Sequence, residues 1–219
     1  MTQAWGPMGW ITLHSISVNY PEVPTKADKT ILKKFLDLFA ETISCPSCKG
    51  HFTAMYKSYT LQYPNWADSR YNLFLFISRA HNTVNKRLDK PRPATVVECI
   101  QSLKMLTVNK TAAQYRTNYI TYLLSNWVRE GGGDGMIQCG NVREMRKINE
   151  QYWNLRETNL DALMFAEADV LTPIMSAQKM LSPFTQIPMY SVNASGGQQA
   201  NAPNFGFRLS GGKFSFGKR

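Results

Sequence analysis

Apolar side chains recur at helical spacing over most of the first 170 residues, and no convincing strand alternation interrupts them. In the first segment Trp10, Leu13 and Ile16 fall on one face, and Pro21 ends the pattern. The same periodicity predicts five helices in the first half of the chain: residues 9–20, a second from a cap at Thr25 or Asp28 to Ile43, 45–59, 67–88 and 95–107. The predicted fold is therefore all-α.

The second half of the chain divides into a helical extension and a tail. Helical patterns cover 111–130 and about 142–168, and the GGGDG stretch between them predicts a flexible break. From Leu181 onward the chain is rich in Gly, Ser, Asn, Gln and Phe and has almost no periodicity. We predict three parts: a domain over 1–107, a mostly helical segment over 108–180 that is a candidate second domain, and an irregular tail over 181–219.

Charge is unevenly distributed along the chain, whose net charge is +10. Residues 1–107 carry 13 basic and 7 acidic side chains, residues 108–182 carry 8 of each, and residues 183–219 carry 4 basic and none acidic. A basic surface suits nucleic acid, an acidic partner or an anionic cofactor. No nucleic-acid motif and no block of five like charges occurs, so nucleic acid is not favoured, and a solvated basic face is the plain alternative.

The chain start and the cysteine content predict an intracellular protein. The sequence begins MTQAWGPMGW, which lacks the basic and long apolar regions of a secretory signal. The strongest apolar run, NLFLFI, is too short to cross a membrane. Four cysteines are few for a secreted disulfide scaffold, so we expect a cytoplasmic protein without a membrane span.

The CPSC stretch is the first candidate for chemistry, and three interpretations compete for it. Pro46 suits a first helical position, which places Cys45 near a helix N-cap, where backbone N–H groups stabilise a thiolate. A redox disulfide with Cys48 fits this, although a thioredoxin would need strands around it. Zinc bound by both cysteines and His51 would lack a fourth ligand. Two inert buried cysteines are the remaining interpretation.

Two further stretches, WGPMGWITLH and HNTVNKRLDKP, carry aromatic, imidazole and amide groups at helical spacing. Trp10 and His14 are four residues apart, as are His81 and Asn85, so each pair shares a helix face. With Lys90 at the end of the second stretch, these groups suit a polar, aromatic, phosphate-bearing ligand. Taken singly, each residue also has a plain interpretation as a core or surface side chain.

Together and in this order, the three stretches resemble the Erv/ALR family of FAD-linked sulfhydryl oxidases. The family pattern is W-G-x3-W-x2-L-H, then C-x2-C, then H-N-x-V-N-x2-L-x-K, and all three elements occur here with their internal spacing. The resemblance covers about residues 5–107.

The resemblance implies a four-helix bundle with a short fifth helix that binds FAD at its mouth, and it implies no metal. Cys48 would be the flavin-proximal thiol, and Cys45 the interchange cysteine that accepts electrons from a substrate dithiol. Lys90 would lie near the phosphates. The implied cofactor-binding positions are Trp10, His14, His81, Asn82, Val84, Asn85, Leu88 and Lys90.

The implied activity is a thiol oxidase that forms disulfides in protein substrates and passes electrons through the CxxC disulfide and FAD to oxygen, giving hydrogen peroxide. The implied partners are thiol-containing proteins or a thioredoxin-like protein, molecular oxygen and a second copy in a homodimer. A catalytically silent virion structural or assembly protein that keeps the fold is the alternative. The Phe-containing tail has two interpretations, a disordered solubilising segment or a peptide that docks on another protein.

The chain departs from the family pattern in its other cysteines. Cellular members carry a second disulfide whose first cysteine would fall at Ser78, and Cys99 lies several residues beyond the expected second position. We therefore expect that staple to be absent, as in the short members of large DNA viruses, which would place the protein in a viral factory or virion. There is no second CxxC, and a shuttle role for Cys99 or Cys139 is the less favoured alternative.

Overall fold

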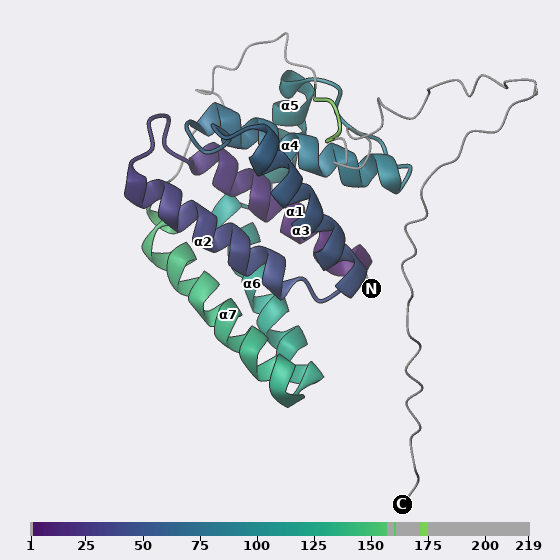
Figure 1. Cartoon of the computed structure of the whole chain (residues 1–219), viewed down its shortest axis with the longest axis vertical. Helices are drawn as coiled ribbons and strands as arrows, with labels where there is room; N and C mark the ends of the chain where they lie inside the picture. Colours follow the sequence, from purple (N-terminus) through teal and green to yellow (C-terminus); the bar gives the residue numbers. More distant parts are fainter. Residues whose placement is uncertain (1, 157–159, 161–170, 175–219) are drawn as a thin grey trace, which may run out of the picture. The chain divides into compact units, whose positions relative to one another are not determined.

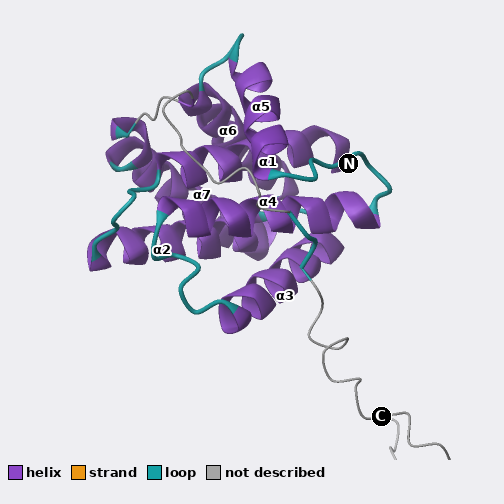
Figure 2. Cartoon of the chain, turned by 90° about the horizontal axis from the view of Figure 1, so that it is seen from above, coloured by secondary structure: helices purple, strands orange, loops and turns teal. Residues whose placement is uncertain are grey.

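A computed structural model gives the fold and describes residues 2–156, 160 and 171–174. The chain divides into two units, Met1–Ser182 and Pro183–Arg219, and all the described residues belong to the first. They form seven α-helices and one 3-10 helix, with no strand (Figures 1 and 2). The prediction of an all-α fold is therefore confirmed. None of the helices described is long and apolar enough to cross a membrane.

The first five helices form the predicted bundle with its short fifth helix. They are α1 (Thr2–Asn19), α2 (Lys26–Thr42), α3 (Pro46–Gln62), α4 (Arg70–Arg87) and α5 (Val96–Thr107). α1 packs on α4, α2 on α3, α3 on α4, and α5 on α4. Their apolar faces meet in one core that includes Leu13, Phe35 and Ile77, all fully buried. Full burial of one such side chain stabilises the fold by about 1.5–3 kcal/mol.

Side-chain caps set where the helices begin. Thr25, rather than Asp28, is the N-cap of α2: its hydroxyl accepts the Asp28 N–H at 3.2 Å, and the Asp28 carboxylate accepts the Thr25 N–H at 2.9 Å. Ser69 caps α4 by accepting the Asn72 N–H at 3.1 Å. The predicted start of α4 at Ala67 is therefore wrong by three residues, because the periodicity does not show the cap.

The first helix begins earlier than predicted. It starts at Thr2 rather than at Gly9 and passes through Pro7. A proline this close to the N-terminus removes only one intrahelical hydrogen bond. Trp5 and Met8 pack against the core, so tertiary contacts outweigh the local signal of Gly6 and Pro7.

The helical extension packs against the bundle in the same unit. α6 (Ala112–Glu130) lies on α1, and α7 (Gly132–Gln151) lies on α2 and α6 (Figure 1). Tyr119 and Leu123 of α6 and Met145 of α7 are buried in the same core as the bundle residues. The predicted domain boundary at residue 107 thus falls inside this compact unit.

The glycine-rich stretch is a tight turn rather than a five-residue break. Only Gly131 and Gly132 have positive φ, 62° and 65°, and α7 starts at Gly132. Gly135 is already helical, and a Cβ there would lie 2.9 Å from the Trp127 carbonyl oxygen of α6. The prediction of a helix beginning near 142 is wrong. After Gly131, the glycines of this stretch are part of α7, where the missing side chain of Gly135 allows α7 to pack closely on α6.

α7 ends at Gln151 and leads into a 3-10 helix, Trp153–Leu155. The predicted continuation to residue 168 lies mostly outside the described residues. Polar contacts join this end to the bundle. The fully buried Arg116 guanidinium donates to Asn149 Oδ1 at 2.8 Å and to Ser15 Oγ at 3.2 Å. The Tyr152 hydroxyl donates to Asp28.

Candidate active site

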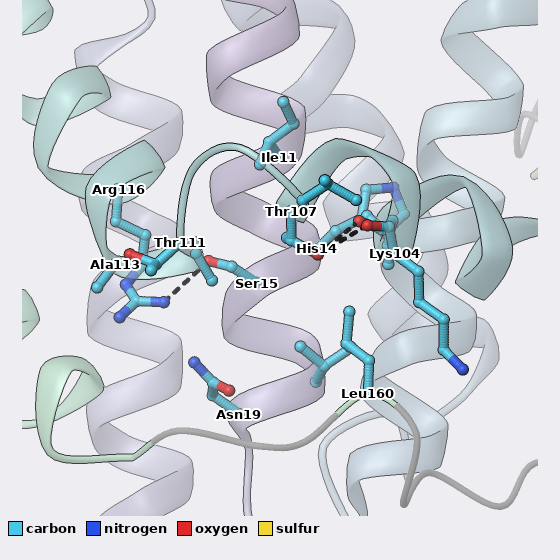
Figure 3. A pocket seen from close by; sticks show the side chains of 14 residues that line it. Ile11, His14, Ser15, Asn19, Lys104, Thr107, Thr111, Ala113, Arg116 and Leu160 are labelled. Carbon is cyan, nitrogen blue, oxygen red and sulfur yellow. Dashed lines mark hydrogen bonds between the residues drawn. The ribbon is translucent and has the colours of Figure 1, made fainter.

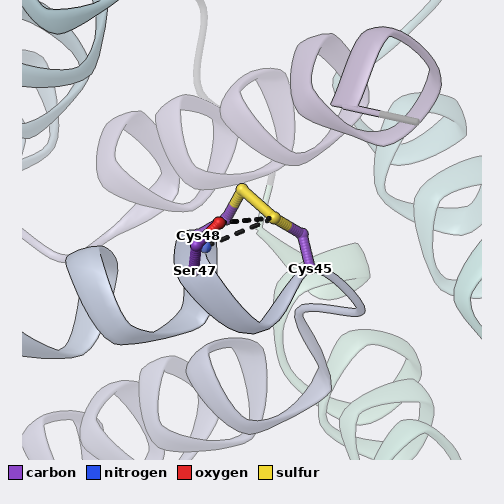
Figure 4. The surroundings of a disulfide bond; sticks show 3 residues. All are labelled: Cys45, Ser47 and Cys48. Atoms are coloured by element: carbon purple, nitrogen blue, oxygen red, sulfur yellow. Dashed lines mark hydrogen bonds between the residues drawn. A yellow bond between two sulfur atoms is a disulfide. The ribbon is translucent and has the colours of Figure 1, made fainter.

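The CPSC stretch forms a disulfide at the N-terminus of α3 (Figure 4). Cys45 is the N-cap residue, Pro46 is the first helical residue, and the Cα atoms of Cys45 and Cys48 are 5.2 Å apart. Both cysteines are half-buried. The backbone N–H of Cys48 donates to Cys45 Sγ at 3.3 Å, and the Ser47 hydroxyl lies 3.4 Å from the same sulfur.

These contacts make the two sulfurs chemically different. A thiolate at Cys45 would receive the Cys48 N–H, the Ser47 hydroxyl and the positive end of the helix dipole. A thiolate released at Cys45, for example from a mixed disulfide with a substrate, would therefore be stabilised. Among the described residues, no group of three His, Cys, Asp or Glu side chains could hold a metal ion, so the structure offers no support for the zinc interpretation with His51.

The disulfide faces a cavity of about 830 Å³ that is lined by all five helices of the bundle and by the α2–α3 and α4–α5 connections. This volume lies in the range of sites that hold drug-sized ligands. Nine of the residues predicted from the sequence line it: Trp10, His14, Cys45, Cys48, His81, Val84, Asn85, Leu88 and Lys90. Residues from three separate stretches of the sequence are thus brought to one site.

Aromatic rings form one wall of this cavity. The Trp10 and His81 rings stack with centroids 4.4 Å apart and an angle of 8° between their planes. Phe52 meets Trp10 edge-on at 6.4 Å. His14 Nε2 lies 3.0 Å from His81 Nδ1, so one imidazole donates to the other. Such a wall suits a planar aromatic ligand.

Burial favours the neutral form of both imidazoles. Burial, followed by the neighbouring His81, lowers the pKa of His14 well below its usual value. Burial, followed by Lys90, lowers the pKa of His81 to about 4. Two buried polar atoms of the lining, His14 Nδ1 and Trp5 Nε1, have no hydrogen-bond partner within the described part of the chain. Because such atoms normally have a partner, they indicate a bound molecule with polar groups.

Asn82 does not line the cavity, unlike the other predicted positions. It is 1% exposed, and its Nδ2 donates to the Pro93 carbonyl at 2.7 Å and to the Leu171 carbonyl at 3.0 Å. The structure therefore places it beneath the α4–α5 connection and not against the cavity. Successive side chains on an α-helix point in directions about 100° apart around the helix axis, so Asn82 and its neighbour His81 face different parts of the structure.

One end of the cavity is basic. Lys90 and Arg87 line it, and the Lys90 backbone N–H donates to the Asn85 carbonyl at 2.9 Å. Anionic groups such as phosphates would be favoured at this end.

Sequence reasoning did not single out several other lining residues: Phe39, Ile43, Ser47, Phe52, Arg87, Pro93, Ser102, Leu103 and Leu106. Cys99 was considered only as a disulfide or shuttle cysteine and not as part of the cavity wall. Phe52 lies four residues after Cys48, a spacing that would have identified it. The α5 residues give no such local signal.

A second cavity of about 500 Å³ lies on the other side of His14 (Figure 3). Ile11, His14 and Leu103 line both cavities. The far wall includes Ser15 of α1 and Arg116 of α6, which are hydrogen-bonded to each other. His14 and its two apolar neighbours therefore separate the disulfide cavity from a space enclosed by the helical extension.

Comparison with known proteins supports the interpretation of the site. The model of the Erv1 / Alr family matches residues 7–118. The chain is 34% identical over 87 residues to the mitochondrial FAD-linked sulfhydryl oxidase ERV1 of Saccharomyces cerevisiae. It is 31% identical over 85 residues to the FAD-linked sulfhydryl oxidase ERV1 of Arabidopsis thaliana. It is 33% identical over 86 residues to the FAD-linked sulfhydryl oxidase of African swine fever virus.

These similarities cover only parts of the proteins compared. The matched segments span 40%, 39% and 39% of this chain, in the same order. They span 44% of the yeast protein, 42% of the plant protein and 69% of the viral protein. No solved structure matches the chain at a significant level.

Proposed function

Because the chain belongs to the Erv1 / Alr family, we propose that it is an FAD-linked sulfhydryl oxidase that forms disulfides in protein substrates. The observation that carries this proposal is the Cys45–Cys48 disulfide facing a cavity that has an aromatic wall and a basic end. Three similar proteins carry the same activity in their names.

The residues present fit FAD. Trp10 and His81 offer flat faces to a ring system, and Lys90 and Arg87 offer positive charge to phosphates. His14 Nδ1 and Trp5 Nε1 are polar atoms that a ligand would satisfy. When bound, FAD supplies a two-electron acceptor that reoxidises the cysteine pair and hands the electrons to oxygen, giving hydrogen peroxide.

Disulfide exchange begins on this chain's own sulfurs. A substrate thiolate attacks Cys45 Sγ, so that a bond between the substrate sulfur and Cys45 forms as the Cys45–Cys48 bond breaks. Cys48 then leaves as a thiolate within the cavity lining. Cys45 is the proposed partner of the substrate and Cys48 that of the cofactor, the roles that the family resemblance implies.

Release of the product uses the environment of Cys45. A second substrate thiolate attacks the substrate sulfur of the mixed disulfide, forms the product disulfide and displaces Cys45. The Cys48 N–H and the Ser47 hydroxyl stabilise the departing Cys45 thiolate. The two cysteines then hold the two electrons taken from the substrate.

The visible absorption spectrum of the purified protein tests the proposal. We expect flavin bands that bleach when dithiothreitol is added without oxygen and that return, with hydrogen peroxide, when oxygen is admitted. Flavin bands that persist under the dithiol would favour the silent assembly protein instead. A colourless protein that remains colourless with added FAD would contradict the proposal.

The proposed substrates are thiol-containing proteins or a thioredoxin-like protein. A homodimer also remains a prediction, and the faces of α1 and α2 that α6 and α7 cover would not be available to a second copy. The proposed setting is the cytoplasm or viral factory of an infected cell, which the similarity to the African swine fever virus protein supports. Docking of the tail on another protein concerns residues outside the described part.

A further inference from the structure

A short segment of the C-terminal half, Leu171–Ile174, lies along the connection between α4 and α5 (Figure 1). We call it the strap. The Leu171 N–H donates to the Ala94 carbonyl at 2.8 Å. Asn82 donates one N–H to the Leu171 carbonyl and the other to the Pro93 carbonyl. One buried amide therefore holds the strap and the connection together.

The strap is also fixed at its far end and by burial. The Ile174 N–H donates to Thr83 Oγ1 of α4 at 2.8 Å, and Ile174 packs against the main core. The Leu171 side chain is 3% exposed and belongs to a small apolar cluster with Phe74, Val96 and Cys99. The strap is thus tied to both helices that flank the connection.

The connection that the strap holds is a wall of the disulfide cavity. Lys90, Pro91 and Pro93 line the cavity from it. It has no helical hydrogen bonds between Lys90 and Ala94, and its residues are mostly exposed. Its position therefore depends on a few tethers, of which Asn82 and the Leu171 N–H are two.

We propose that the strap retains the cofactor by holding the α4–α5 connection against the cavity. Leu171, Ile174 and Thr83 act as positioning residues, since none of them lines the cavity. The identity of the retained ligand as FAD rests on the proposed function. The strap lies beyond residues 7–118, so it adds to the site a part of the chain that the family model does not match.

The first test removes one tether without touching the cavity. Thr83→Val eliminates the acceptor of the Ile174 N–H at nearly constant volume, and we expect FAD release to accelerate by about three- to tenfold, as for loss of one hydrogen bond. Release is followed by the rise in flavin fluorescence after dilution of the full-length, FAD-loaded protein. Thr83→Ser keeps the hydroxyl, so this variant should release FAD as slowly as the wild-type chain does. Fast release in Thr83→Val together with slow release in Thr83→Ser would point to the hydroxyl and not to a general loss of stability.

Matched controls separate the strap from ordinary helix stability. The Thr83 hydroxyl also donates to the Arg79 carbonyl, and Thr30 makes the same contact four residues back, to Lys26. Thr30→Val should therefore leave FAD release unchanged. Leu171→Ala should accelerate release more than Thr83→Val does, whereas Leu155→Ala, at a leucine that is 75% exposed, should not.

Hydrogen exchange of residues 88–95 provides a readout that does not require FAD. We expect faster exchange of this segment in Thr83→Val and in Leu171→Ala than in the wild-type chain. If Thr83→Val shows wild-type hydrogen exchange in residues 88–95 and wild-type FAD release, the proposed role of the strap is wrong. A wild-type protein that binds no FAD would refute the proposed function. The hydrogen-exchange rates would still show whether the strap holds the α4–α5 connection in place.

Discussion

Ser78 Oγ lies 3.5 Å from Cys99 Sγ, so that α4 and α5 present these two side chains to each other. In the described structure Cys99 is a free, buried thiol that faces a serine, which agrees with the expected absence of a second disulfide at this place. The connection and the start of α5 bring Cys99 back to α4. A cysteine at position 78 would therefore place a second sulfur close to Cys99 Sγ.

Ser78→Cys should create a disulfide with Cys99 and stabilise the fold. The pair would close a loop with a sequence separation of 21 residues, for which loop closure predicts about 3 kcal/mol. Thermal unfolding of the oxidised and reduced variant, with thiol counting on the denatured protein, measures this.

Ser78→Ala is the matched control, and it should gain no stability on oxidation. Burial raises the pKa of the Cys99 thiol to about 11, so oxidation of the pair should be slow near neutral pH. Two free thiols remaining in the oxidised Ser78→Cys protein would contradict the inferred geometry.

Replacing either cysteine of the CPSC stretch should abolish thiol oxidation. Cys48→Ser and Cys45→Ser each remove a sulfur needed for the exchange steps, and we expect oxygen consumption with dithiothreitol to fall by at least about a hundredfold. Cys139→Ala is the control, because Cys139 is a buried free thiol outside the cavity lining and should leave turnover unchanged. Substantial activity in Cys45→Ser would refute its role, and loss of activity in Cys139→Ala would revive the shuttle alternative.

Lys90→Ala should weaken FAD binding by about tenfold, because it removes a positive charge at the basic end of the cavity. Titration of the FAD-free protein with FAD measures the dissociation constant. Lys86→Ala removes an exposed lysine of the same helix end that does not line the cavity. Equal weakening in both variants would indicate a general effect of net charge and not a phosphate contact.

The FAD-free chain should lose stability as pH falls below about 6.5. Folding lowers the pKa of His14 and lowers that of His81 to about 4, so below the ordinary value the unfolded chain binds more protons than the folded one. The stabilisation is complete above about pH 6.5 and decreases toward about pH 4 and below. For His81 alone we expect a loss of about 2 kcal/mol between about pH 7.5 and about pH 5.

Urea unfolding at several pH values checks this, with substitutions that isolate the buried pair. His81→Gln should flatten the dependence, whereas His51→Gln, at an exposed position, should leave it as in wild type. A free energy of unfolding that is constant over this range would show that the two imidazoles are not buried as a neutral pair.

Gly135→Ala should destabilise the protein by about 1–3 kcal/mol, although alanine normally favours a helix. The new Cβ would lie 2.9 Å from the Trp127 carbonyl oxygen and would force α6 and α7 apart. Gly133→Ala is the matched control two residues earlier, because a Cβ there meets nothing within 4 Å. Denaturant unfolding of both variants measures the difference, and equal stabilities would contradict the close packing of the hairpin.

The sequence by itself determined the helical class and most of the site. Periodicity located α2, α3 and α6 to within a few residues, because a helix that buries one face must repeat its apolar residues every three to four positions. The Trp10–His14 and His81–Asn85 pairs were identified for the same reason. The CPSC stretch was recognisable because the position of Pro46 fixes a helix start.

Tertiary structure alone decided what depends on contacts between segments distant in the chain. The close packing of Gly135 on Trp127, the approach of Cys99 to Ser78 and the packing of α6 on α1 have no local signature. Asn82 shows this most clearly: its place in the motif suggests a cofactor contact, yet its partners include the carbonyl of Leu171, 89 residues away. A sequence pattern predicts which face of a helix a residue occupies. What the side chain on that face binds depends on distant segments of the folded chain, because a buried polar group must find a hydrogen-bond partner there.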